Sequence, residues 1–95
     1  MSAVLTRELG LNHADFYRLL PKTLNGQSFQ VTELGITLCD ERRRLMVRLA
    51  PERVRQIASL HIPVTEVTFE FHGYSDEEMA AFMSDFEHHY QRGGG

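Results

Sequence analysis

The sequence predicts one α+β domain: a two-layer sandwich with a mostly antiparallel sheet of three or four strands and two or three amphipathic helices on one face. A continuous apolar stripe at helical spacing marks residues 76–91, apolar–polar alternation from Glu66 to Phe71 marks a strand over 64–71, and prolines and glycines separate short elements. Ninety-five residues are enough for one core. We expect the order α–β–β–β–α–β–α, a domain over 1–92 and a flexible glycine tail over 93–95.

The N-terminal part predicts one helix from Asn12 to about Leu20. Asn12 is a strong N-cap, and Asp15 suits the positive end of the helix dipole. Pro21 should then end the helix. One helix face would carry the apolar side chains Phe16, Leu19 and Leu20. Residues 2–9 fit either a short helix or a strand.

The middle of the sequence predicts a turn at Asn25–Gly26 and then strands. The apolar phase changes along the way, since Phe29 and Val31 are odd-numbered and the next apolar positions are even: Leu34, Ile36 and Leu38. A bulge near Gly35 or a tight turn at Thr32–Glu33 must absorb this shift. Residues 40–43 should form a hairpin loop, followed by a strand whose inward side chains are Leu45, Val47 and Leu49.

The last part predicts a helix, a strand and a second helix. Pro51 suits a first helical position, and residues 51–63 carry Val54, Ile57, Ala58 and His61 at helical spacing, which would leave His61 at the edge of the core. Residues 64–71 form the clearest strand. Ser75 and Glu78 have the spacing of a capping box for a final helix that Gly93 should end. Phe69 and Phe86 should meet in the core.

Charge is distributed unevenly along the chain. Residues 42–55 hold six arginines against Glu52, whereas the acidic residues dominate from residue 56 onward. The strand after the hairpin would place Arg44, Met46 and Arg48 on the outward sheet face, with Arg42 and Arg43 in the adjoining loop. Guanidinium groups in such a cluster can grip a carboxylate or phosphate. The alternative is that these arginines pair with Glu66 and Glu70 on a neighbouring strand and only stabilise the sheet.

The leading hypothesis is therefore a small binding or regulatory module whose arginine-rich face, formed by Arg42, Arg43, Arg44, Met46 and Arg48, takes a protein partner or an acidic or phosphate-bearing ligand. A second hypothesis is a small enzyme or carrier with a pocket near Cys39 and His72, or with a functional glycine tail similar to the Gly-Gly ends of sulfur carriers and ubiquitin-like modifiers. In those families the tail follows a strand, whereas here it follows a helix. A nucleic-acid binder is the third; it has arginines but no aromatic side chain on the open face to stack bases, and the net charge is −3.

The remaining expectations are mostly absences. Asp85 and His89 share a helix face, but the sequence offers no third ligand at a usual spacing, so we expect no metal and no cofactor. Whether the protein is an enzyme is left open, and the sequence favours a protein that is not one. The apolar runs are too short for a membrane span, we read no secretion signal at residues 1–10, and the single cysteine fits a reducing compartment, so a cytoplasmic protein is expected. Self-association into a homo-oligomer is left open.

Overall fold

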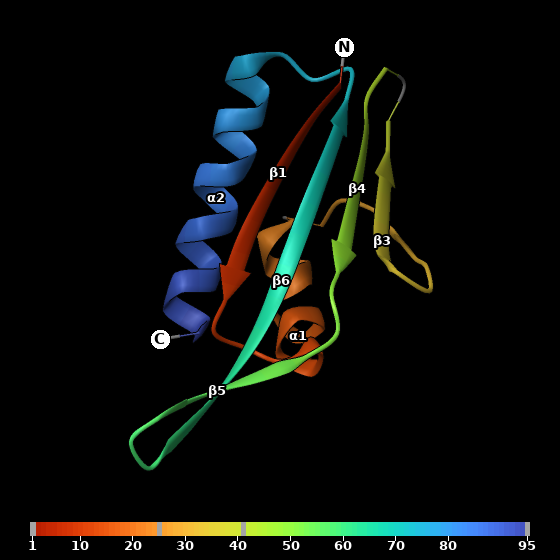
Figure 1. The fold of residues 1–95 in the computed structure, drawn as a ribbon. Coiled ribbons are helices and arrows are strands. Elements are labelled where there is room, and N and C mark those ends of the chain that lie inside the picture. Colours follow the sequence, from red (N-terminus) through yellow and green to blue (C-terminus); the bar gives the residue numbers. More distant parts are fainter. Residues whose placement is uncertain (1, 25, 41, 95) are drawn as a thin grey trace.

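A computed structural model describes residues 2–24, 26–40 and 42–94, with side chains described up to Tyr90. It is an α+β fold with two helices and a six-stranded antiparallel sheet (Figure 1). The elements follow one another as β1 (Ser2–Leu9), α1 (His13–Thr23), β2 (Gln30–Val31), β3 (Gly35–Cys39), β4 (Arg44–Leu49), β5 (Arg53–Ile57), β6 (Leu60–His72) and α2 (Asp76–Gly94).

The sheet is organised around β6, the longest strand. The strand order is β1–β6–β4–β3–β2, and β5 pairs with the first part of β6. Both helices lie on one face of the sheet and contact each other, so the opposite face is open (Figure 1). The predicted two-layer arrangement is correct, but the sheet has more strands than expected and a different element order.

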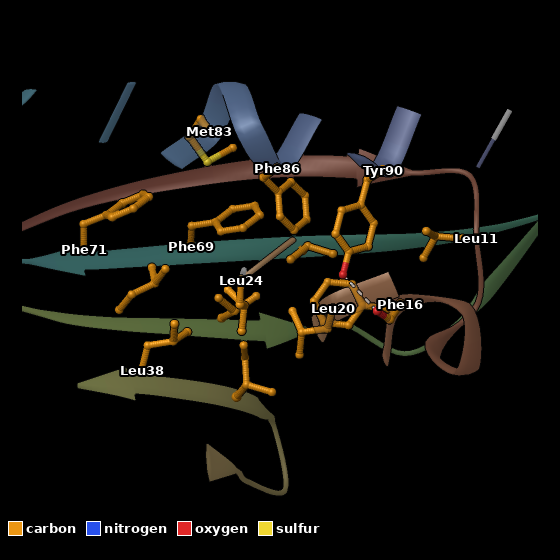
Figure 2. Packing of buried hydrophobic residues seen from close by; sticks show 14 residues of the cluster. Leu11, Phe16, Leu20, Leu24, Leu38, Phe69, Phe71, Met83, Phe86 and Tyr90 are labelled. Carbon is orange, nitrogen blue, oxygen red and sulfur yellow. Dashed lines mark hydrogen bonds between the residues drawn. The ribbon is translucent and has the colours of Figure 1, made fainter. Parts of the chain in front are cut away.

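The core lies between the sheet and the two helices (Figure 2). Phe69 of β6 and Phe86 of α2 are both buried, with ring centroids 4.7 Å apart, as the sequence predicts. Tyr90 stacks on Phe86 at 4.1 Å, and its hydroxyl donates a hydrogen bond of 2.8 Å to the carbonyl oxygen of Phe16. Burial raises the pKa of the Tyr90 phenol, which keeps this donor protonated. One hydrogen bond thus joins α2 to α1 inside the core.

The predicted helix over 51–63 is wrong. β5 and the start of β6 form a hairpin there, closed by Ala58 and Ser59 between the paired residues Ile57 and Leu60. This hairpin projects from the body of the domain, and residues 51–61 are all exposed (Figure 1). His61, expected at the edge of the core, is therefore exposed on β6, and the fold has no β–α–β crossover in this region.

A β-bulge at Pro51 and Glu52 explains why the periodicity is misleading here. Ala50 donates its N–H to Glu66, whereas Arg53 pairs with Val64, so two residues on one strand stand opposite Thr65 alone. The bulge reverses the alternation of side chains between β4 and β5. Val54 and Ile57 consequently lie on opposite faces of a ribbon, although their spacing also fits one face of a helix.

The structure also decides the remaining local predictions. The predicted end of the last helix at Gly93 is wrong, because α2 continues to Gly94. Residues 2–9, for which helix and strand were both open, form β1. The change of phase after Val31 is absorbed by the tight-turn alternative, since Thr32 and Gly35 exchange backbone hydrogen bonds. Helix α1 does not stop at Leu20 but includes Pro21, because Thr23 and Leu24 bond back to Leu19 and Leu20 and close the last turn. Asn25, half of the predicted turn, lies outside the described residues.

Candidate functional site

The open face of the sheet carries the predicted arginine strand, β4. The register fixes its neighbours: Arg44 lies between Cys39 of β3 and His72 of β6, and Met46 lies between Thr37 and Glu70. Arg48 stands one step further along the strand, opposite Thr68. Arg44, Met46 and Arg48 therefore share the open face, as the sequence predicts.

Arg48 is engaged in the sheet. Its guanidinium lies 3.4 Å from one oxygen of Glu70, and the other oxygen of Glu70 lies 2.9 Å from Nε2 of His72. This is the cross-strand pairing that the structural alternative predicts for Glu70. Glu66 does not take part, because it stands opposite Glu8 of β1. Arg48 thus stabilises the pairing of β4 with β6, where half-exposed pairs contribute only about 0.2–1 kcal/mol.

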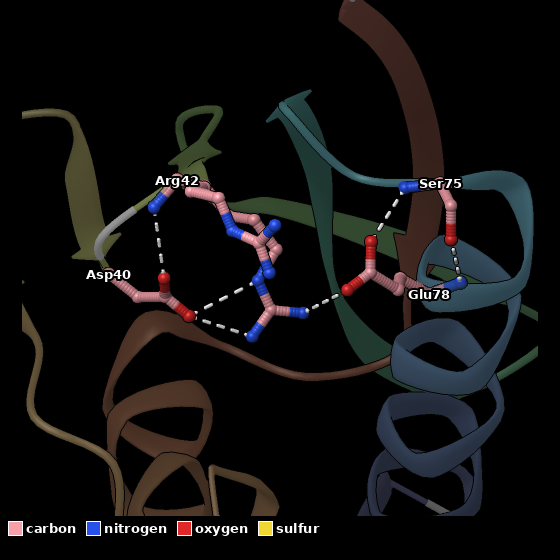
Figure 3. A network of polar contacts seen from close by, with 5 residues as sticks. Asp40, Arg42, Ser75 and Glu78 are labelled. Atoms are coloured by element: carbon pink, nitrogen blue, oxygen red, sulfur yellow. Dashed lines mark hydrogen bonds and ion pairs between the residues drawn. The ribbon is translucent and has the colours of Figure 1, made fainter.

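Arg43 is turned toward the helices and away from the open face. Its guanidinium donates to Asp40 within its own loop and to Glu78 of α2, at 2.8 Å each; Figure 3 labels both acceptors and marks these contacts with dashed lines. The guanidinium also lies 4.9 Å from the ring centroid of Tyr74. Glu78 also accepts from the backbone N–H of Ser75, while Ser75 Oγ accepts from the N–H of Glu78, which confirms the predicted capping box. Arg43 therefore ties the β3–β4 loop to the first turn of α2.

The charges of this network depend on one another. The hydrogen bond from Arg43 lowers the pKa of Asp40, and the backbone hydrogen bond from Ser75, helped by Arg43, lowers the pKa of Glu78. Gly73 completes the junction, because its φ of +79° suits glycine and a Cβ there would lie 2.2 Å from the carbonyl oxygen of Arg42. Asp40, Arg42 and Arg43 are consequently held close to β6 and to the start of α2.

Replacing Arg43 with Gln should lower the melting temperature at neutral pH and have less effect in acid. Carboxyls with depressed folded-state pKa values stabilise the fold above their ordinary pKa of about 4, and that contribution is lost as pH falls through the folded values. We expect the difference between parent and variant to shrink between about pH 4 and pH 2. Thermal melts across this range measure it, with Arg18→Gln, which breaks the exposed pair with Asp15, as the control. A difference that stays constant with pH would mean that Arg43 acts through packing on Tyr74.

Two further arginines reach the open face through a contact that the sequence did not reveal. Arg53 and Arg55 of β5 both form ion pairs with Glu8 of β1. They point to this face because the bulge at Pro51 and Glu52 shifts the alternation. The i, i+2 spacing of the two arginines is typical of a strand, and from this spacing the sequence could have predicted that they share one face.

Arg42 and Arg44 remain, and we call them the arginine corner. Both side chains are exposed, and neither makes an ion pair with any residue whose side chain the structure describes. Every other arginine in that part of the chain is paired with a carboxylate: Arg7, Arg18, Arg43, Arg48, Arg53 and Arg55. The predicted cluster therefore divides into a structural part and an exposed corner.

The second hypothesis places Cys39 and His72 in one pocket. They lie in one row of the open face but two strands apart, with Arg44 between them, a separation of about 10 Å. A shallow depression of about 160 Å³ beside Cys39 is lined also by Asp40, Arg43 and Tyr74. Ligand pockets usually begin near about 300 Å³, and the guanidinium beside this one is already bound to carboxylates. The geometry gives the Cys39 thiol no imidazole partner in His72.

The histidines of α2 do not form the metal site that their spacing would allow. Nδ1 of His89 lies 2.8 Å from the backbone oxygen of Asp85, so the imidazole contacts the carbonyl of that residue. Within residues 2–24, 26–40 and 42–94, no three His, Cys, Asp or Glu side chains are grouped to hold a metal ion.

Comparison with known proteins adds no function, since no family model, curated protein or solved structure gives a significant match to this chain. None of the helices in the described part of the chain is long and apolar enough to cross a membrane.

Proposed function

We propose that this chain is a small binding module that holds an acidic segment of a protein partner at the arginine corner. The contrast between Arg42 and Arg44 and all other described arginines carries the proposal. A guanidinium already bound to a carboxylate has fewer free N–H donors to offer a second one, whereas Arg42 and Arg44, which pair with no described side chain, keep theirs for a ligand. A carboxylate of a ligand can therefore bind at the arginine corner without displacing an ion pair that the structure describes.

The surroundings support a site of fixed shape. Arg44 stands on a strand paired on both sides, and the loop that carries Arg42 is bound to α2 through Arg43 and lies against Gly73. The backbone of both residues is thus positioned before binding, and only the two arginine side chains lose conformational freedom when a ligand binds. Met46, on the next row of the same face, offers apolar contact beside Arg44, whereas Val4 lies in that row on the far side of Glu70.

A labelled oligo-glutamate peptide tests the proposal by fluorescence anisotropy. Changing Arg42 and Arg44 together to Gln should weaken binding about tenfold, which is about 1.4 kcal/mol, and should reduce its dependence on salt. The matched control is Arg18→Gln with Lys22→Gln, which removes the same charge from exposed positions on α1. Equal loss in both double variants would mean that net charge alone attracts the peptide, and no loss in either would place the site elsewhere.

A further inference from the structure

We propose that β1 is the interface of a two-fold symmetric homodimer, in which β1 of one copy pairs antiparallel with β1 of a second copy. Such pairing would join two six-stranded sheets into one continuous sheet. The proposal is independent of the arginine corner, since it rests on the backbone edge of β1.

The hydrogen-bond pattern shows which groups of β1 face outward. In an antiparallel strand, the N–H and C=O of one residue point to the same side, and successive residues alternate. Glu66 of β6 bonds toward β4, so the odd-numbered residues of β6 bond toward β1. Their partners in β1 are Ala3, Leu5, Arg7 and Leu9. The backbone groups of Ser2, Val4, Thr6 and Glu8 therefore point away from the sheet.

β1 is longer and more regular than the other described edges, and its two charged side chains, Arg7 and Glu8, are already paired within the chain. Natural sheets blunt their edges with very short strands, bulges, prolines or charged side chains. β2 has only two residues, β5 follows the bulge at Pro51 and carries two arginines, and the part of β6 that extends past β1 contains Pro63. By contrast, β1 has eight residues, contains no proline or glycine, and keeps one register along its whole length.

The strand is complementary to itself when the two-fold axis passes through Leu5. Leu5 then faces Leu5 of the second copy, and Val4, which is 58% exposed, faces Thr6. Ala3 faces Arg7 and Ser2 faces Glu8, so no like charges oppose each other. A shift by one pairing step would either set Leu5 against Arg7 or shorten the overlap. Isologous contact of this kind is what a two-fold dimer requires.

The helix beside the strand presents small side chains on the side that lies toward β1. Glu87 of α2 is ion-paired to Arg7 of β1 at 2.9 Å, so this side of the helix lies toward the edge strand. Ser84 and Ala80 precede Glu87 by three and seven residues and share that side. Both are small and exposed. Between Ala80 and Ser84, this side of the helix therefore offers only small side chains to a chain approaching β1.

Proline substitution separates pairing within the chain from pairing between chains. Thr6→Pro removes an N–H that points outward, so the pairing with β6 is kept while the dimer interface is blocked. Val54→Pro is the matched control, because the N–H of Val54 points to the outer edge of β5, which is not the proposed interface. In sedimentation equilibrium we expect the parent and Val54→Pro to reach the dimer mass, and Thr6→Pro to dimerise about 100-fold more weakly or not at all.

Hydrogen exchange of the unmodified protein gives an answer that needs no variant. The outward amides of Val4, Thr6 and Glu8 should become protected as protein concentration rises, although none of them has an acceptor in the described part of the chain. A parent that stays monomeric throughout the concentration series would overturn the proposal. So would outward amides that exchange freely in the dimer, or a dimer lost in Val54→Pro and kept in Thr6→Pro.

Discussion

Phe86→Ala should destabilise the protein by about 3–5 kcal/mol, the largest effect we expect from one substitution. Phe86 is 1% exposed, stacks on Tyr90 and meets the edge of Phe69, so its removal leaves a cavity lined by rings that cannot close it. Small domains have only about 5–15 kcal/mol of stability in total, so much of the reserve would be lost.

Urea denaturation of Phe86→Ala and of a surface control measures this effect. Val31→Ala is the control, because that side chain is 65% exposed and its truncation should change stability by less than about 0.5 kcal/mol. If the midpoint of Phe86→Ala equalled that of the parent, α2 could not pack on the sheet through this residue.

Gly35→Ala should have the second largest effect and lower the free energy of unfolding by about 3 kcal/mol. A Cβ at this position would lie 1.9 Å from the carbonyl oxygen of Val47, so β3 and β4 would have to separate where they pair. The tight turn between Thr32 and Gly35 would be displaced as well.

The matched control for this substitution is Gly26→Ala. Gly26 has a φ of +83°, but a Cβ added there would have no neighbouring atom within 4 Å, so alanine meets backbone strain alone, about 1–2 kcal/mol. Denaturation curves of the two variants should differ clearly. Equal losses would show that steric contact with Val47 contributes nothing and that β3 does not approach β4 as described.

The parts of the fold that the sequence predicts well are those in which several local signals agree. Residues 76–90 combine the reciprocal capping of Ser75 and Glu78 with an apolar stripe that faces the core. Residues 66–71 alternate strictly because one face of β6 packs on the helices. In both segments, the periodicity, the end signals and the burial all indicate the same structure.

The hairpin at 53–64 could not be predicted in the same way. Its apolar side chains point to both sides of an exposed ribbon, so no buried face imposes a period of two, and the helical spacing of Val54 and Ile57 arises by coincidence. The bulge that turns Arg53 and Arg55 to the open face depends on pairing with distant β6. The local sequence therefore does not determine the register of this hairpin.

The candidate site was predicted in part for a related reason. Alternation correctly places Arg44, Met46 and Arg48 on one face, because β4 is a regular strand between two neighbours. It cannot show that Arg43 turns to Glu78, since this contact joins residues 35 positions apart. Which arginines are left without a carboxylate depends on such long-range pairs, and only the tertiary structure supplies them.

Residue-resolved NMR titration with the oligo-glutamate peptide tests the central claim, that the arginine corner is the binding site, most directly. We expect saturable shifts of the amides around Arg42 and Arg44, extending to Cys39 and His72 on the flanking strands. The amides around Lys22 on α1 should stay unchanged. Shifts of these amides would indicate that the peptide is attracted non-specifically by positive charge. Shifts centred on α1, or shifts that do not saturate, would contradict the assignment of the corner.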